Sequence, residues 1–377
     1  MARPTVLMVL VLLAGACSSS TSDSPSLATE PTAQAEEPAV AEPTPAAEPS
    51  ATPEPTAVPE PSATPESTAL PEPSATPGST ATSEPAAVAP TIDELLAEDS
   101  VVNLAHAGGD QSWPHSTPYA FAEAVKAGAG VLELDVQLTG DGVLVVQHDD
   151  TVDKTTEATG PVIDLTLAEL QALDNAYWFS PECWPCQDRP LDEYIYRGVR
   201  TGDTEPPAGY TADDFRVATF REIAERFPTL PLDIEIKGEL PQAGIVAEVL
   251  AAELDELGRT DSVVVVSFDD EVIDAFRALA PDVAVSPGTT RLTTWVLAGT
   301  PLEDGFEIIQ VPPESSGVDV VTPESVARAH DEGLTIWVWP NDAETQENEA
   351  FYRQLVELGV DGVIAGRPEE MAAATAG

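Results

Sequence analysis

Short β-rich runs alternate with longer segments of helical periodicity from residue 100 to residue 366, and this alternation limits the possible folds more than any other feature. The runs are four to six residues long and mostly apolar, as in strands buried on both faces. Eight strands joined by helical crossovers predict an α/β fold, a (β/α)8 TIM barrel. The predicted strands are residues 101–106, 131–136, 231–236, 262–267, 283–286, 307–311, 335–339 and 361–365, and the predicted helices are residues 118–127, 242–257, 270–279, 323–332 and 347–358.

An open, doubly wound sheet is the alternative fold for the same alternation. It would require a glycine-rich turn after the first strand, and Ala107-Gly108-Gly109 is a weak match to such a turn. One further β-rich run, residues 143–147, does not fit a parallel sheet. It follows the second strand across residues 139–142, a link too short for a crossover. We therefore expect an antiparallel β-hairpin flap beside the barrel.

Composition divides the chain into three parts. In residues 1–17, Arg3 precedes an apolar run that is too short to span a bilayer and fits a secretory signal. Residues 18–90 contain 16 of the 36 prolines, no Lys or Arg, and Glu-Pro-Ser-Ala-Thr-Pro at intervals of twelve residues, which predicts a disordered, extended stalk. Residues 91–377 contain all six Trp and all six Tyr, enough for one folded domain with a large core.

The end of the first part resembles a bacterial lipoprotein signal. Small residues precede Cys17, and a run of serines follows it. The resemblance implies cleavage before Cys17, lipidation of its thiol, and an exported protein anchored to the membrane at the bacterial cell surface. Ordinary secretion with an incidental cysteine is the alternative.

The charge of the chain excludes some partners. It has 66 acidic against 16 basic residues, a net charge of −50. Binding nucleic acid through its phosphates requires a basic face, so we expect no nucleic-acid partner. Electrostatic docking on an anionic membrane is excluded for the same reason.

The two remaining cysteines, Cys183 and Cys186, are separated by Trp-Pro. Zinc would need further ligands, and no histidine lies between His148 and His330. In an exported protein we expect a local disulfide between Cys183 and Cys186. Metal binding and redox catalysis are the alternatives.

Three carboxylates are predicted to meet at the barrel rim. Glu133 and Asp135 alternate with leucines on one strand, and Glu235 and Lys237 alternate with isoleucines on another, so each pair faces the barrel interior. Carboxylates gathered in a partly desolvated site raise their pKa values or recruit a metal. Their oxygens suit Ca²⁺ or Mg²⁺. In so acidic a chain, salt-bridged surface acids are the alternative.

Two histidines end strands beside these acids. His106 ends the first strand and His148 ends the flap. Imidazoles titrate near neutral pH and suit proton transfer. His115 lies in a proline-flanked loop near the same rim, where it contacts substrate or is solvated. His330 lies on a helix, and we expect it to be packed in a structural role.

From about residue 101 to residue 370, the chain resembles the glycerophosphodiester phosphodiesterase family. The resemblance implies a TIM barrel that hydrolyses glycerophosphodiesters, with a divalent metal, to an alcohol and glycerol phosphate. By position it implies His106 and His148 as the acid–base pair, Glu133, Asp135 and Glu235 as the metal ligands, and Lys237 as the cation near the phosphate. The motifs that carry it are His106-x-Gly-Gly, Pro114-x-x-Thr117, Glu133-Leu-Asp135-Val, Thr139-x-Asp-Gly142, Val-x-His148-Asp149, Asp233-Ile-Glu235-Ile-Lys237 and Arg367-Pro368.

The sequence departs from the family pattern at several positions. Ala107 replaces the usual Arg, which removes a guanidinium clamp on phosphate. Gly366 replaces the usual Asp before the last Arg-Pro. His115 and Trp339 stand in altered motifs and are the candidate substrate-binding residues. The candidates for replacing the missing guanidinium are Arg189, Arg197 and Arg200.

Residues 177–215 form a long insertion rich in aromatic side chains. It is either a lid that grips an alcohol or lipid group, or a loop packed on itself. Two other functions stay open beside the phosphodiesterase. One is a lysophospholipase D-like enzyme, and the other is a non-catalytic lipoprotein that binds phosphodiesters.

Overall fold

The computed structural model describes residues 88–181 and 183–376. The predicted signal, the lipidation site Cys17 and all but the last three residues of the predicted stalk lie outside the described residues. No helix in the described part of the chain is both long enough and apolar enough to cross a bilayer.

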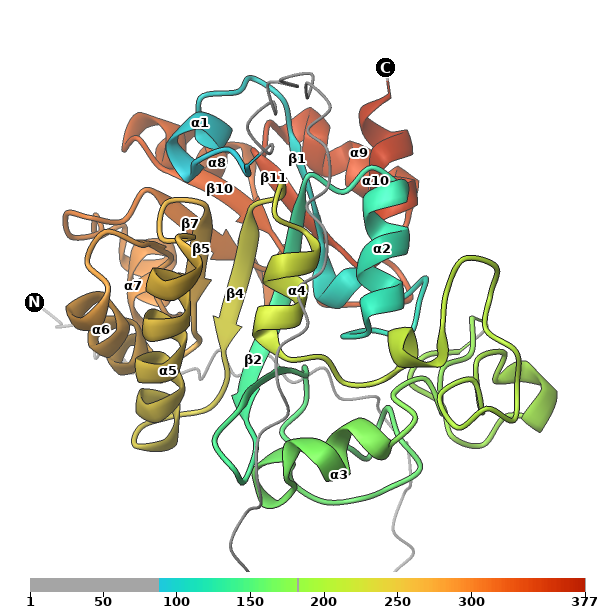
Figure 1. Cartoon of the computed structure of the whole chain (residues 1–377). Helices are drawn as coiled ribbons and strands as arrows, with labels where there is room; N and C mark the ends of the chain where they lie inside the picture. The colour runs from blue at the N-terminus through green and yellow to red at the C-terminus, as the bar shows by residue number, and fades with distance from the viewer. Residues whose placement is uncertain (1–87, 182, 377) are drawn as a thin grey trace, which may run out of the picture. The chain divides into compact units, whose positions relative to one another are not determined.

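Eight parallel strands form a nearly closed barrel (Figure 1). Hydrogen bonding joins them in the order β6-β5-β4-β2-β1-β11-β10-β7. Neighbouring strands in this path are consecutive barrel strands along the chain, except that the first, β1, pairs with the last, β11. The circle is open only between β6 and β7, which share no ladder in the described residues. All eight predicted strands and the TIM-barrel fold are confirmed. The strands are β1 (Val102–Ala105), β2 (Val131–Leu138), β4 (Leu232–Ile236), β5 (Val263–Val266), β6 (Ala284–Val285), β7 (Ile308–Val311), β10 (Thr335–Val338) and β11 (Gly362–Ala365).

The predicted flap is confirmed as β3 (Leu144–Val146). It pairs antiparallel with the end of β2, with Val136 opposite Val146. The link between β2 and β3 turns at Gly142, whose φ of 80° suits glycine. Because β2 extends beyond the barrel to pair with β3, the flap stands at the carboxyl-terminal rim.

Helices cover the outside of the barrel (Figure 1). The five predicted helices are confirmed, and the sequence patterns missed four short or weakly periodic ones as well as α7. A capping box at Thr219 and Glu222 begins one of these, α4. The helices are α1 (Ile92–Leu96), α2 (Pro118–Lys126), α3 (Leu167–Ala172), α4 (Phe220–Arg226), α5 (Gln242–Leu257), α6 (Asp270–Leu279), α7 (Thr289–Ala298), α8 (Pro323–Asp331), α9 (Glu349–Leu358) and α10 (Pro368–Thr375); the hairpin β8 (Glu314–Ser315) and β9 (Val318–Asp319) completes the fold.

The core lies between the strands and the helices. Leu132 and Leu134 of β2 and Ile234 of β4 pack in one buried cluster with helix side chains such as Leu250 and Phe276. This outward orientation of the apolar residues leaves their polar neighbours on β2 and β4 to face the barrel interior.

The two ends of the barrel differ. At the amino-terminal end, Ile92 and Leu95 of α1 pack in a cluster with Leu104, Val264 and other strand residues. The interior is therefore closed by apolar side chains at that end, and the carboxyl-terminal end carries the flap and the long loops.

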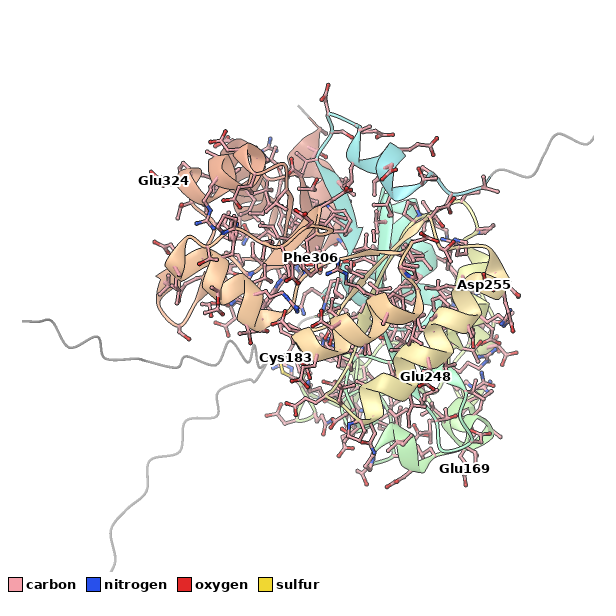
Figure 2. All side chains as sticks on the ribbon, turned by 90° about the vertical axis from the view of Figure 1, so that its left-hand side faces the viewer. Glu169, Cys183, Glu248, Asp255, Phe306 and Glu324 are labelled. Carbon is pink, nitrogen blue, oxygen red and sulfur yellow. A yellow bond between two sulfur atoms is a disulfide. The ribbon has the colours of Figure 1, made fainter. Side chains whose placement is uncertain are left out.

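The acidic excess lies on the outer surface. Glu248 and Asp255 of α5 and Glu324 of α8 are exposed (Figure 2). Exposed carboxylates of this kind contribute to the net charge and are solvated by water.

Candidate active site

A cavity of about 390 Å³ opens at the carboxyl-terminal end of the barrel. The structure brings six predicted site residues together in its lining: His106, Glu133, His148, Glu235, Lys237 and Trp339. A cavity at this end of the strands is the usual place of catalytic sites in this fold.

The three predicted carboxylates form one cluster. Asp135 of β2 lies directly opposite Glu235 of β4 in the sheet register, and Glu133 stands two residues earlier on β2. Each residue offers one oxygen, and the three oxygens lie within 4.8 Å of one another. All three residues are buried.

The cluster fits a hard divalent cation. Asp135 Oδ2 accepts no hydrogen bond in the described residues, and Oδ1 is paired with Lys237 Nζ at 2.8 Å. Buried carboxylate oxygens need a positive partner, and a donor set made only of oxygen is the type that Ca²⁺ and Mg²⁺ prefer. Glu133, Asp135 and Glu235 could therefore hold such an ion.

Lys237 supplies positive charge at the same cluster. Its Nζ lies 2.8 Å from Asp135 Oδ1 and 2.8 Å from Glu235 Oε2. Burial lowers the pKa of Lys237, but the two carboxylates outweigh this and raise it above its usual value. Burial and the neighbouring Asp135 together raise the pKa of Glu133 well above its usual range. One ammonium for three carboxylates leaves a local demand for a further cation.

His106 and His148 lie next to each other in the cavity lining. Their ring centroids are 5.4 Å apart, with the rings inclined at 77°. Nδ1 of His148 lies 3.4 Å from Asp149 Oδ1. The same oxygen also forms an ion pair with Lys154 Nζ at 2.7 Å. The His148 ring is therefore held beside a carboxylate, and both rings line the same cavity as the acid cluster.

Asp110 is the carboxylate beside His106, and the sequence analysis missed it. Its Oδ1 lies 3.2 Å from His106 Nδ1. Burial lowers the pKa of His106, but Asp110 and Glu133 outweigh it and hold the pKa well above its usual value. Burial raises the pKa of Asp110, but His106 outweighs it and lowers the pKa to about 2. An acid four residues after a candidate catalytic histidine is the signal that could have identified Asp110.

Ala107 replaces the family's usual arginine in a strained turn. Its φ of 46° is uncommon for a residue with a side chain. Its backbone N–H donates to Glu133 Oε2 at 2.7 Å, and its side chain is fully buried. The turn thus fixes Glu133 by a backbone contact and presents no guanidinium.

The three candidate replacement arginines lie away from the cavity lining. Arg189 pairs with Glu193, and Arg200 pairs with Asp213. Arg197 stacks over three aromatic rings, with its Cζ 4.0 Å from the ring centre of Tyr194. In the described chain, Lys237 is therefore the only Lys or Arg that lines the cavity.

Gly366 leaves room for Asp110. A Cβ at position 366 would lie 2.5 Å from Asp110 Oδ1 and 3.0 Å from the carboxyl carbon of Glu347. Glu347 accepts hydrogen bonds from the Gly366 N–H, at 2.9 Å, and from the Tyr352 hydroxyl. Burial and the nearby Asp110 raise the pKa of Glu347 to about 8. No sequence pattern predicted that Glu347, Tyr352 and Gly366 would gather around Asp110.

His115 is buried, so its interpretation as a solvated residue is wrong. It is 4% exposed and does not line the cavity. Its ring centroid lies 5.9 Å from that of His148 and 5.1 Å from that of Trp184. Burial and His148 lower its pKa to about 4, which keeps it neutral at pH 7. His115 therefore packs edge-on against His148.

The other predicted site residues lie as follows. Trp339 lines the cavity and packs edge-on against Phe268, with ring centroids 5.8 Å apart. Cys183 and Cys186 are joined in a disulfide within the insertion.

His330 is exposed on α8 and lies 3.0 Å from Asp361, so the expectation that it is packed is wrong.

The aromatic insertion packs on itself and on α2. The ring of Tyr119 lies 5.1 Å from Tyr196, 4.7 Å from Tyr210 and 4.7 Å from Phe215. None of the described residues in 177–215 lines the cavity. The lid interpretation therefore has no support, and Trp184 of the insertion packs against His115.

Comparisons with known proteins agree with this geometry. The Glycerophosphoryl diester phosphodiesterase family model matches residues 106–370. The chain is 30% identical to YhdW, a proposed glycerophosphodiester phosphodiesterase of Bacillus subtilis strain 168, over 71% of this chain and 94% of that protein. It is 27% identical to the glycerophosphodiester phosphodiesterase of the same bacterium, over 73% of this chain and 86% of that one.

Solved structures share the fold. An Oleispira antarctica phosphodiesterase, solved with the product sn-glycerol-3-phosphate, superimposes with a TM-score of 0.51 at 20% identity, over 72% of this chain and 95% of that one. At that identity the likeness concerns the fold alone. The family match and the YhdW identity together show that the chain belongs to the glycerophosphoryl diester phosphodiesterase family and is a phosphoric diester hydrolase.

Proposed function

We propose that this protein hydrolyses glycerophosphodiesters to an alcohol and glycerol phosphate in a reaction that depends on Ca²⁺ or Mg²⁺. The observation that carries the proposal is a single cavity lined by two imidazoles, two carboxylates and one ammonium, with the third carboxylate, Asp135, clustered beside them. The match to the glycerophosphoryl diester phosphodiesterase family supports glycerol phosphate as the product here.

His106 and His148 are the proposed acid–base pair. In-line displacement at phosphorus needs a base for the attacking oxygen and an acid for the leaving oxygen. With Nδ1 facing Asp110, His106 has its Nε2 available to exchange a proton at the cavity. His148 is oriented in the same way by Asp149. Both rings line the space in which a phosphodiester would lie.

Glu133, Asp135 and Glu235 are the proposed metal ligands. A divalent cation bound there would neutralise charge on the phosphate oxygens. Lys237 is the chain's own cation at the cavity, and we propose that it attracts the phosphate while balancing Asp135 and Glu235. This local positive charge is needed because the chain as a whole is strongly acidic.

The alternative of a non-catalytic binding protein loses support from the same residues. A binding site for phosphodiesters needs cations but has no need for two carboxylate-held imidazoles. Turnover separates the two functions. We expect the purified protein to release choline from glycerophosphocholine with Ca²⁺ or Mg²⁺ and to stop when EDTA is added. Tight binding of glycerophosphocholine without turnover would favour the binding protein.

For location, we propose an exported protein held at the bacterial cell surface by a lipid on Cys17. The support comes from the signal-like residues 1–17 and the proline-rich residues 18–90. Mass spectrometry of the membrane-extracted protein tests this. A lipidated Cys17 at the mature N-terminus is the expected result, and an unmodified Cys17 in a released protein contradicts it.

A further inference from the structure

Gly366 leaves a space at the carboxyl-terminal rim that two acids from other segments fill. It follows β11 directly and has no side chain. A Cβ at this position would lie 2.5 Å from Asp110 Oδ1 and 3.0 Å from the carboxyl carbon of Glu347. Asp110 belongs to the turn after β1, and Glu347 belongs to the loop before α9. The two carboxyl groups are therefore neighbours at the place that a side chain of residue 366 would occupy.

Uncharged groups fix the position of Glu347. Its Oε2 accepts a hydrogen bond from the Gly366 N–H at 2.9 Å and another from the Tyr352 hydroxyl. Tyr352 is fully buried on α9, and its hydroxyl accepts in turn from the Arg367 N–H at 3.3 Å. The Glu347 carboxyl group is thus held by a helix and by the turn that follows β11, through donors that bring no positive charge.

Asp110 has a cationic partner. Its Oδ1 lies 3.2 Å from His106 Nδ1. Two neighbouring acids beside one imidazole cannot both ionise without cost, so one of them keeps its proton. Burial raises the pKa of Asp110, but His106 outweighs it and lowers the pKa to about 2. Burial and Asp110 raise the pKa of Glu347 to about 8. At pH 7 Asp110 is therefore an anion and Glu347 is a neutral acid.

The neutral state of Glu347 keeps Asp110 in place. An uncharged carboxyl group occupies the space beside Asp110 without repelling it, whereas an ionised one would push the two groups apart. The titratable groups that act most strongly on Glu347 are Asp110 and His106 after β1 and Tyr352 on α9, and the turn after β11 adds the N–H of Gly366. Displacement of Asp110 would release Nδ1 of His106 and with it the orientation of the imidazole.

We infer that Glu347 is a positioning residue for the reaction, which supplies the carboxyl group that Gly366 lacks and, as a neutral acid, confines Asp110 against His106. This inference rests on the proposed function, because it concerns the orientation of one member of the acid–base pair. Neither Glu347 nor Asp110 lines the cavity. Glu347 therefore acts through Asp110 and does not meet the substrate.

Removal of the carboxyl group tests this role. Glu347→Ala leaves Asp110 unconfined, and we expect kcat for choline release from glycerophosphocholine to fall about fivefold or more while KM changes less than about twofold. Glu347→Gln keeps the size and the uncharged state of the side chain, and we expect it to retain at least about half of the rate at pH 7. Glu344→Ala, at an exposed position in the same loop, is the control and should keep the full rate.

A double-mutant cycle shows whether Glu347 acts through Asp110. In the Asp110→Asn background, Glu347→Ala should lower kcat by less than about twofold, since the contact that Glu347 supports is already altered. Equal fold losses in both backgrounds would overturn the inference. Thermal unfolding of each variant identifies those that are folded under the conditions of the assay.

The pH dependence of kcat gives a readout that a purely structural role would not change. Glutamine at position 347 cannot ionise, whereas Glu347 loses its proton near pH 8 and then repels Asp110. We expect the ratio of kcat for Glu347→Gln to kcat for the unaltered protein to be constant below pH 7 and to rise at least about twofold by pH 9. A ratio that does not rise would overturn the inference, and this comparison does not depend on the folding of Glu347→Ala.

The outcomes separate this inference from the proposed function. Turnover of glycerophosphocholine by Glu347→Ala at the rate of Glu344→Ala would overturn the inference and leave the proposed function standing. No turnover by the unaltered protein with either Ca²⁺ or Mg²⁺ would overturn both.

Discussion

Nδ1 of His106 lies 3.2 Å from Oδ1 of Asp110, four residues later in the same turn. The contact fixes the orientation of the imidazole, since the neighbouring Gln111 also donates to Asp110, at 2.9 Å. It places a negative charge behind the ring on the side away from the cavity. Asp110 is therefore a positioning residue for the proposed acid–base pair.

Asp110→Asn is expected to lower kcat by about tenfold and to shift the pH profile. The carboxylate raises the pKa of His106, so its removal lowers that pKa. Whichever proton transfer His106 performs, the limb of the profile that it sets moves to lower pH. The pH dependence of kcat measures this. Asp255→Asn, at an exposed position on α5, is the control, and an unshifted profile in Asp110→Asn would contradict the assigned role.

Glu235→Gln is expected to weaken binding of Ca²⁺ or Mg²⁺ by about tenfold or more, because the affinity of such sites depends on the number of charged ligands. Titration calorimetry measures this without any substrate. Glu248→Gln, exposed on the outer face of α5, should bind the ion like the unaltered protein. Equal affinities in all three proteins would place the metal elsewhere.

Gly366→Ala is expected to reduce the free energy of unfolding by about 1–3 kcal/mol, because the added methyl has no room. It would meet Asp110 Oδ1 at 2.5 Å and Gln111 Cγ at 2.7 Å. In the Asp110→Ala background the cost of Gly366→Ala should be smaller, since part of the obstruction is gone. Denaturant unfolding of the four proteins measures this coupling, and strictly additive effects would contradict the proposed packing.

Glu347→Gln is expected to stabilise the protein at alkaline pH. The folded-state pKa of Glu347 is raised to about 8, above the value near 4.3 expected when unfolded. Between these values the folded state binds more protons than the unfolded state, so the contribution of Glu347 to stability is lost as pH rises towards 8. A glutamine side chain keeps a carbonyl oxygen that accepts the hydrogen bonds from Tyr352 and Gly366, and it cannot become negatively charged at high pH.

The gain should be on the order of 1 kcal/mol at pH 9 and absent near pH 4, because the side chain is only partly buried. Thermal unfolding at both pH values measures it, with Glu324→Gln on the exposed face of α8 as control. A gain of equal size at both pH values would indicate an effect unrelated to the titration of Glu347.

The barrel and its acid cluster could be predicted because both follow from local patterns. The alternation of residues in Glu133-Leu-Asp135 and Glu235-Ile-Lys237 defines the faces of β2 and β4, and parallel register brings these faces together. The same strands carry the core leucines and isoleucines, so packing and the site are set by one periodicity.

The errors and omissions arise where distant segments meet. His115 stands in a loop of polar appearance, but Trp184 from the insertion covers it. Glu347, just before α9, comes close to Asp110, in the loop after β1, only in the folded chain. Nothing in the local sequence distinguishes Glu347 from the many other acids. The interruption of the barrel between β6 and β7 depends on how far each ladder extends, which periodicity does not specify.

The most direct test of the central claim is turnover of glycerophosphocholine by the His106→Ala variant beside a His330→Ala control. Both changes remove an imidazole, but His330 lies on the exposed face of α8, where its partner is Asp361. With Ca²⁺ or Mg²⁺ present, we expect His106→Ala to lose about a hundredfold or more in kcat and His330→Ala to keep the rate of the unaltered protein. A His106→Ala protein that is folded, binds the metal and turns over at the rate of the control would contradict the assignment of the active site.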